Sequence, residues 1–195
     1  MEGLDSPRLI IVAGPNGAGK STLTLTLGLQ HQEVIDPDAI ARVENCSPVE
    51  AGRRALYRLR SFITSGKTCL QETTLSGRSL FGHVRHAKAA GFVFELHYIG
   101  LDDCRIAKDR VAGRAAQGGH DIPPEDICRR YSRGLRNLPD FLRLCDRGVL
   151  YDNSWPGTPF MVIANIGEAG LLPQDEKPAS IPQWARRALR EAGFA

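Results

Sequence analysis

Residues 13–22 of this 195-residue chain, AGPNGAGKST, give the strongest indication of its fold. These residues match the pattern G-x-x-x-x-G-K-[ST], and the apolar run RLIIVA at 8–13 leads directly into them. A buried strand, a glycine-rich loop and a helix form the context in which this pattern indicates a phosphate-binding P-loop. A glycine-rich turn without a ligand is the alternative, but such a turn has no need of the lysine and hydroxyl that end the pattern.

Each part of the loop has a predicted contact with a nucleotide. Backbone N–H groups surround the β-phosphate, Lys20 spans the β and γ phosphates, and Ser21 coordinates Mg²⁺. The chain has no N-K-x-D motif to read guanine, so ATP is the expected nucleotide. The residues predicted to bind it are Gly14, Pro15, Asn16, Gly17, Ala18, Gly19, Lys20, Ser21 and Thr22.

The rest of the chain alternates apolar runs with helical segments. Helices are predicted at 47–65, where Ser47 is placed to cap the first turn, and at about 78–90. Such alternation predicts an α/β P-loop NTPase: a parallel sheet with helices on both faces, in a single domain over 1–195. Strands are predicted at 8–14, 33–36, 67–72, 92–100, 148–154 and 160–167.

Two segments interrupt this alternation. Residues 113–131 hold a Gly-Gly pair and a Pro-Pro pair between Arg-rich helical stretches, which predicts a small movable lid. Residues 171–195 read as a linker and a short amphipathic helix. Trp184 and Leu189 are expected to pack that helix on the domain.

Composition narrows the class of protein. Lys and Arg number 25 against 22 acidic residues, without long blocks of one sign, so neither nucleic acid nor a membrane is an expected partner. No apolar stretch reaches the roughly 18 residues of a membrane helix. The five cysteines show no C-x-x-C pair, which predicts reduced thiols in a cytoplasmic protein.

Motifs also separate the P-loop classes. A transporter ATPase would need an apolar strand ending in Asp-Glu and a full signature loop, whereas LSGR at 75–78 is only a fragment of that loop. A small-molecule kinase is favoured, and it needs an acid that takes the proton of the acceptor hydroxyl. Asp38, in IDPDAIA, is the predicted base, while Asp36 braces the turn or the metal shell. The alternative is that both aspartates only cap a helix.

Acceptor contacts are expected in QETTLSGR, residues 71–78. Glu72 ends a predicted strand at the rim of the crevice, where a carboxylate can hold Mg²⁺ through water or orient the acceptor. Thr73, Thr74, Ser76 and Arg78 add donors for a hydroxylated or phosphorylated substrate. A helix cap or a salt bridge is the alternative role for Glu72.

Arginines near the lid are candidates for stabilising the transferred phosphoryl group. Arg110 and Arg114 share one helical face, and Arg129, Arg133 and Arg136 share another. We favour Arg110 as catalytic, Arg130 as a nucleotide contact and His120 as a substrate contact. A solvated surface charge is the alternative for each arginine.

Taken together, AGPNGAGKST, IDPDAIA, QETTLSGR, RVAGRAAQGGHDIPPEDICRRYSRGL and YDNS resemble the zeta-toxin family of P-loop kinases. The resemblance implies an ATP- and Mg²⁺-dependent kinase acting on UDP-N-acetylglucosamine or a related sugar nucleotide, with an antitoxin protein as candidate partner. It implies that Asp38 is the base, that Glu72 holds the acceptor, and that Arg110 is the first lid arginine. The second lid arginine is replaced at or near His120.

Three other functions stay open. The chain could phosphorylate another small metabolite without being a toxin. It could also be an ATPase whose nucleotide state drives a protein partner, or a regulatory module that binds ATP without turnover.

Overall fold

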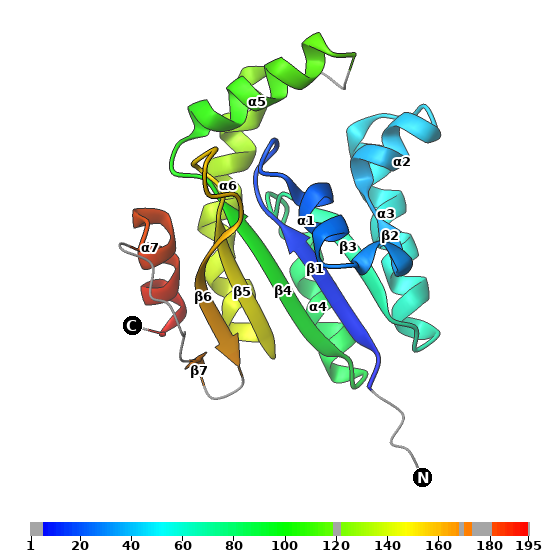
Figure 1. Ribbon diagram of the computed structural model, residues 1–195. Helices are drawn as coiled ribbons and strands as arrows, with labels where there is room; N and C mark the ends of the chain where they lie inside the picture. Colours follow the sequence, from blue (N-terminus) through cyan, green and yellow to red (C-terminus); the bar gives the residue numbers. More distant parts are fainter. Residues whose placement is uncertain (1–5, 119–121, 168–169, 173–180, 195) are drawn as a thin grey trace.

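A computed structural model describes residues 6–118, 122–167, 170–172 and 181–194. Its centre is a seven-stranded sheet with the order β2-β3-β1-β4-β5-β6-β7 (Figure 1). The first five strands in this order are parallel to one another. Strand β6 is antiparallel to β5, and β7 is antiparallel to β6. The strands are β1 (Arg8–Ala13), β2 (Glu33–Ile35), β3 (Cys69–Thr73), β4 (Val93–Gly100), β5 (Arg147–Asp152), β6 (Met161–Gly167) and β7 (Gly170–Leu172).

The antiparallel edge corrects the expectation of a wholly parallel sheet. A parallel connection needs a crossover of a dozen or more residues. Only residues 153–160 separate β5 from β6, so β6 returns beside β5 as a hairpin. The prediction of strands at 148–154 and 160–167 is confirmed, and their relative direction is the new finding.

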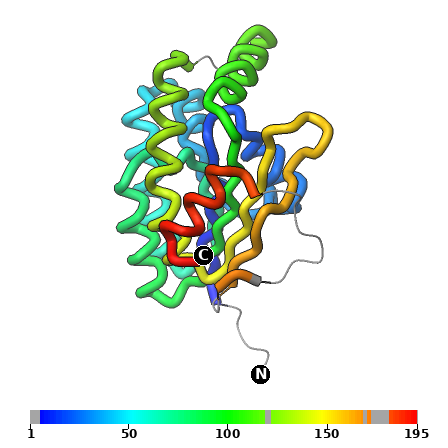
Figure 2. The backbone as a smooth tube through the Cα atoms, turned by 90° about the vertical axis from the view of Figure 1, so that its left-hand side faces the viewer, coloured from blue at the N-terminus to red at the C-terminus, as the bar shows by residue number. Residues whose placement is uncertain are grey.

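Helices cover both faces of the sheet. Leu9 and Ile11 of β1 face a core shared with α3, α4, α6 and α7, whereas Ile10 and Val12 face the one under α1 and α5. Figure 2 shows the helices of the first core, α3, α4 and α6, alongside the sheet. The helices are α1 (Lys20–Thr26), α2 (Pro37–Val43), α3 (Pro48–Thr64), α4 (Ser79–Ala89), α5 (Cys104–Ala116), α6 (Pro124–Leu144) and α7 (Gln183–Ala192), with a 3-10 turn at Leu29–His31.

The helix boundaries follow local chemistry. Ser47 caps α3 by accepting a hydrogen bond from the Glu50 N–H at 3.2 Å, and Gly66 takes the left-handed conformation after its end, with φ 65°. In α7, Trp184 and Leu189 are buried, and the Trp184 ring lies 5.6 Å from that of Tyr98. The predicted packing of this helix is confirmed.

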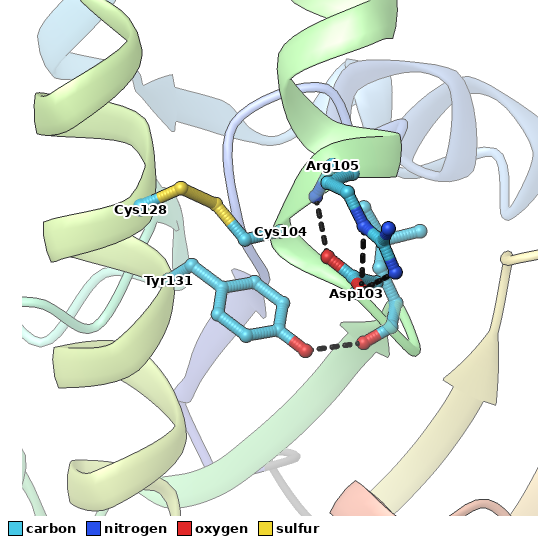
Figure 3. The surroundings of a disulfide bond; sticks show 6 residues. Asp103, Cys104, Arg105, Cys128 and Tyr131 are labelled. Carbon is cyan, nitrogen blue, oxygen red and sulfur yellow. Dashed lines mark hydrogen bonds and ion pairs between the residues drawn. A yellow bond between two sulfur atoms is a disulfide. The ribbon is translucent and has the colours of Figure 1, made fainter.

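Two of the five cysteines form a disulfide, so the prediction that all are reduced thiols is wrong. Cys104 at the start of α5 and Cys128 in α6 form a disulfide, with their Cα atoms 5.5 Å apart (Figure 3). Tyr131, one turn further along α6, donates a hydrogen bond to the Leu101 carbonyl at 2.8 Å. Sequence spacing does not reveal this pair because only the packing of α5 on α6 brings the two thiols together. Cys46, Cys69 and Cys145 are free thiols.

Within the described part of the chain, every helix is too short or too polar to cross a membrane.

Candidate active site

The P-loop, residues 14–19, joins β1 to α1 through three glycines with positive φ. A Cβ on Gly14 would lie 2.4 Å from the Ile99 carbonyl oxygen. One on Gly19 would lie 3.1 Å from the Phe160 ring. Gly14 requires glycine because both its positive φ and the fixed carbonyl oxygen exclude a side chain, whereas at Gly19 the positive φ of 94° is the main reason. The Gly14 N–H donates to the Thr73 carbonyl at 3.1 Å and the Ala18 N–H to the Pro15 carbonyl at 3.2 Å. Among the described residues, the N–H groups of Asn16, Gly17 and Gly19 have no such carbonyl partner and can meet an anion.

Lys20 is the first residue of α1 and bends back over the loop. Its Nζ donates to the carbonyl oxygens of Gly14 and Pro15, each at 3.2 Å. Burial lowers the pKa of Lys20, and the carboxylates of Asp38 and Glu72 oppose that shift. The ammonium group thus lies among acids at the mouth of the P-loop.

Glu72 lies beside the P-loop because β3 pairs directly with β1, which places Glu72 opposite Val12. The carboxylate accepts hydrogen bonds from Ser21 Oγ at 2.8 Å and Thr24 Oγ1 at 2.9 Å. Its exposed fraction is 5%, and this burial raises the pKa of Glu72. Glu72 therefore contacts the predicted Mg²⁺ ligand Ser21 directly.

The two aspartates of IDPDAIA take different roles. Asp36 is the N-cap of α2, and its Oδ1 accepts a hydrogen bond from the Asp38 N–H at 2.9 Å. Burial raises the pKa of Asp36. Asp38, in the first turn of α2, is exposed toward the cavities described next. Capping thus accounts for Asp36 and leaves the Asp38 carboxylate available.

Two cavities open on either side of these acids. The first, which we call the P-loop cavity, has a volume of about 480 Å³ and is bordered by Asn16, Gly17 and residues 19–22. The second, the β3 cavity, has a volume of about 430 Å³ and lies between α3, α4, α6 and the end of β3. Both cavities share four lining residues, Lys20, Asp36, Asp38 and Glu72.

The arginines divide between the two cavities. Arg110 and Arg114 line the P-loop cavity, and Arg110 donates to the Asn153 carbonyl at 2.8 Å and the Gly17 carbonyl at 3.4 Å. Arg130 was expected at the nucleotide, but it lines the β3 cavity with Arg133.

Two further lid predictions have different outcomes. His120, the predicted substrate contact, lies outside the described residues. Arg129, which the sequence groups with Arg133 on one helical face, instead pairs with Asp126 at 2.8 Å.

The predicted acceptor contacts are only partly brought together. Thr73, Thr74 and Ser76 line the β3 cavity, and the Thr74 and Ser76 hydroxyls lie 2.9 Å apart. Arg78 does not join them. Its side chain is 81% exposed and lies 3.6 Å from Asp140, outside the lining of either cavity.

The chain is similar in sequence to a protein of Haemophilus influenzae. An uncharacterized protein of Haemophilus influenzae is 35% identical over 129 residues, which cover 64% of this chain and 92% of that protein. The chain belongs to the same family as this Haemophilus protein. No family model matches the sequence.

Solved structures confirm the predicted fold. A chain from the PezAT chromosomal toxin-antitoxin system of Streptococcus pneumoniae aligns with a TM-score of 0.62 at 15% identity, covering 96% of this chain and 85% of that one. A chain from the complex of AvrRxo1-ORF1 and AvrRxo1-ORF2 with ATP aligns with a TM-score of 0.67 at 13% identity, covering 97% and 81%. The resemblance to zeta-toxin kinases is thus confirmed at the level of the fold.

Three further side chains belong to the site, although the sequence motifs do not single them out. Asn153 donates from Nδ2 to the Ala18 carbonyl at 2.9 Å, and Phe160 packs on Gly19, so both brace the P-loop. Gln71 is buried at the floor of the β3 cavity. The signal for Asn153 was its place in YDNS at the carboxyl end of a strand, where ligands bind in such sheets.

Proposed function

We propose that this protein is a kinase that transfers the γ-phosphoryl group of ATP to a hydroxyl of a small acceptor. The observation that carries the proposal is the meeting of the two cavities at Lys20, Asp38 and Glu72. One cavity is built on a P-loop, and the other is lined by hydroxyls and arginines. A donor in the first and an acceptor in the second would place their reacting groups at the shared acids.

The side chains around the P-loop cavity fit Mg²⁺ as well as ATP. Ser21 supplies a hydroxyl oxygen 2.8 Å from Glu72, and Asp38 lines the same cavity, so the available ligands are the oxygens that Mg²⁺ prefers. Ser21 would hold the ion directly and Glu72 through water. When bound, Mg²⁺ neutralises phosphate charge as the phosphoryl group transfers.

The chain's own residues supply the remaining chemistry. The hydroxyl oxygen of the acceptor bonds to the γ-phosphorus of ATP, and Asp38 accepts the proton of that hydroxyl. The bond from the γ-phosphorus to the oxygen that leaves with ADP breaks. Lys20 leaves the Gly14 and Pro15 carbonyls to contact the phosphates. Arg110, braced on Asn153, faces the same cavity and stabilises charge on the transferring group.

The favoured acceptor is UDP-N-acetylglucosamine or a related sugar nucleotide, by resemblance of the motifs to zeta-toxin kinases. An antitoxin protein is proposed as a partner on the same ground, and the fold shared with a chain of the PezAT system supports it. A kinase for another hydroxylated metabolite is the second candidate, since the hydroxyls and arginines of the β3 cavity suit other phosphorylated acceptors.

The deciding experiment measures ATP consumption with Mg²⁺, with and without UDP-N-acetylglucosamine, and analyses the sugar nucleotide for added phosphate. The Lys20→Ala variant is the blank. Asp38→Asn should lower kcat by roughly 10²- to 10⁴-fold without loss of stability. Asp36→Ala is the matched control: it removes a helix cap and should cost about 1 kcal/mol of unfolding free energy.

Each outcome has a distinct meaning. A product that depends on Lys20 and Asp38 supports the kinase, and full activity of Asp38→Asn removes Asp38 as the base. ADP formed without a phosphorylated acceptor, and stimulated by a protein partner, would support the ATPase. ATP binding without any turnover would support the regulatory module.

A further inference from the structure

We propose that the β3 cavity selects a phosphorylated acceptor, with Arg130 and Arg133 binding its phosphate and Gln71 reading a polar group of the same molecule. The inference rests on the proposed kinase function, which it deepens by assigning the acceptor's binding residues. Two independent features of the cavity carry it. One is a pair of arginines that have no carboxylate partner among the described residues, and the other is a buried amide oxygen that accepts no hydrogen bond from them.

Arg130 and Arg133 are placed over the cavity by the packing of α6. Gly134 is the point of closest approach, where a Cβ would lie 2.4 Å from the Thr74 carbonyl oxygen. Asn137, one turn on, donates to the Leu75 carbonyl at 2.7 Å. These two contacts fix α6 against the loop that follows β3, so the preceding turn of the helix lies along the cavity.

The charges of the cavity are separated. Its three carboxylates, Asp36, Asp38 and Glu72, also line the P-loop cavity and lie near Lys20. Among the described residues, no carboxylate is within ion-pair distance of Arg130 or Arg133. One guanidinium group suffices for a carboxylate, whereas two match the charge of a phosphate monoester or a diphosphate.

Gln71 supplies the second feature. It lies in β3 between Ile11 of β1 and Ile35 of β2, and its exposed fraction is 3%. Its Oε1 atom has no hydrogen-bond partner in the part of the chain that the structure describes, although the residue lines the β3 cavity. An unsatisfied buried oxygen destabilises a folded chain. A ligand that donates an N–H or O–H group to Gln71 would remove that penalty.

The first test uses inorganic pyrophosphate as the probe, on the full chain with its P-loop saturated by Mg²⁺ and a non-hydrolysable ATP analogue. Calorimetry should show binding to the wild type. Arg130→Gln and Arg133→Gln should each raise the Kd by about 10-fold or more, as expected for loss of a charge-assisted contact. Arg129→Gln, which makes the same charge change on the same helix but outside the cavity, should leave the Kd unchanged.

The second test uses Gln71→Met, a near-isosteric change that leaves no unsatisfied oxygen. The ligand-free variant should melt a few degrees higher than the wild type. Its pyrophosphate Kd should be unchanged, whereas the KM for UDP-N-acetylglucosamine should rise about 10-fold with kcat within about 3-fold. A lower melting temperature, or an unchanged KM beside active transfer, would overturn the role of Gln71.

The outcomes separate this inference from the proposed function. Pyrophosphate binding that depends on Arg130 and Arg133, without any Lys20-dependent transfer, would retain the anion site and reject the kinase. Transfer to N-acetylglucosamine as fast as to its 1-phosphate or its UDP derivative would retain the kinase and reject the phosphate selection. Equal losses in Arg129→Gln and Arg130→Gln would reject the arginine pair as well.

Discussion

Glu72 is a buried carboxylate whose direct partners are hydroxyl groups. Ser21 and Thr24 donate to its two oxygens, and Lys20 acts on it only through the electrostatic field. Desolvation outweighs these favourable contacts, so burial raises the pKa of Glu72. Such a cost in stability is common at sites that must receive a cation.

The raised pKa of Glu72 should make the free energy of unfolding depend on pH. The folded protein holds the Glu72 proton more tightly than the unfolded chain, so the free energy of unfolding falls as pH rises through the ordinary carboxyl pKa of 4.5, and the loss is complete above the raised value. Glu72→Gln should therefore melt higher than the wild type at pH 7, by an amount that shrinks toward zero below pH 4.5, in thermal scans across pH.

The matched control for this prediction is Glu33→Gln, which changes an exposed glutamate on the edge strand β2. Its melting temperature at pH 7 should equal that of the wild type. Should Glu72→Gln melt lower than the wild type at neutral pH, the two hydroxyl contacts would outweigh desolvation, and Glu72 would be a structural acid.

Among the helices, α5 and α6 carry arginines of both cavities, whereas Arg42 of the P-loop cavity comes from α2. Arg110 reaches the P-loop cavity from α5, and Arg130 reaches the β3 cavity from α6. The disulfide between Cys104 and Cys128 joins the two helices 24 residues apart in sequence. It links the first residue of α5 to α6 about one turn after the start of that helix.

Removal of this cross-link should destabilise the fold. The closed loop of 24 residues corresponds to roughly 3 kcal/mol of unfolding free energy, mainly through entropy returned to the unfolded chain. Urea unfolding of a Cys104→Ser, Cys128→Ser double variant measures this loss. A dithiol reductant should lower the stability of the wild type and leave the double variant unchanged. Titration of five free thiols in unreduced, denatured protein would contradict the disulfide.

The arginines that α6 presents to the β3 cavity are determined by the rotation of the helix about its axis. Spacing alone grouped Arg129 with Arg133, whereas the cavity receives Arg130 and Arg133. The buried positions Ile127, Gly134 and Leu138 set the rotation of the helix. Arg130 lies beside that buried stripe and Arg129 lies away from it, so the apolar residues were a better guide to the functional face than the arginines themselves.

For the molecule as a whole, the last helix closes the core. Trp184 of α7 packs on Tyr98 at the centre of the sheet, and Gly100 of β4 makes room for its ring. A Cβ on Gly100 would lie 2.2 Å from that ring. The C-terminal helix is thus part of the same core that supports the P-loop strand, since β4 pairs with β1 along its length.

Changes at this contact should reduce global stability. Trp184→Ala should cost about 3–5 kcal/mol through the cavity it leaves. Gly100→Ala should cost roughly 1–3 kcal/mol through overpacking. In a Trp155→Phe background, where Trp184 is the single tryptophan, Gly100→Ala should also shift the fluorescence emission to longer wavelength.

Gly82→Ala is the control for this pair, because a Cβ at that position in α4 has no atom within 4 Å. It should be neutral or stabilising by up to about 1 kcal/mol. Equal stability of Gly100→Ala and Gly82→Ala would mean that α7 does not pack where the structure places it.

Features that depend on neighbours along the chain can be predicted from the amino-acid sequence alone. The P-loop, the strand that precedes it, the capped helix α3 and the alternation of strands and helices all follow from local spacing, because backbone angles and helix caps are set by adjacent residues. The same local chemistry marked Asp38 and Glu72 at strand ends, where a parallel sheet gathers its ligands.

Features that depend on residues far apart in sequence become evident only once the chain is folded. The Cys104–Cys128 disulfide, the antiparallel return of β6, the bracing of the P-loop by Asn153 and the assignment of Arg130 to the β3 cavity all require two segments to be placed against each other. Gln71 belongs to this group as well: within a strand it reads as one polar residue among apolar ones, and its unpaired oxygen is evident only when the cavity above it is formed. Packing creates these relations, because the free energy of each depends on which surfaces meet rather than on which residues are adjacent in sequence.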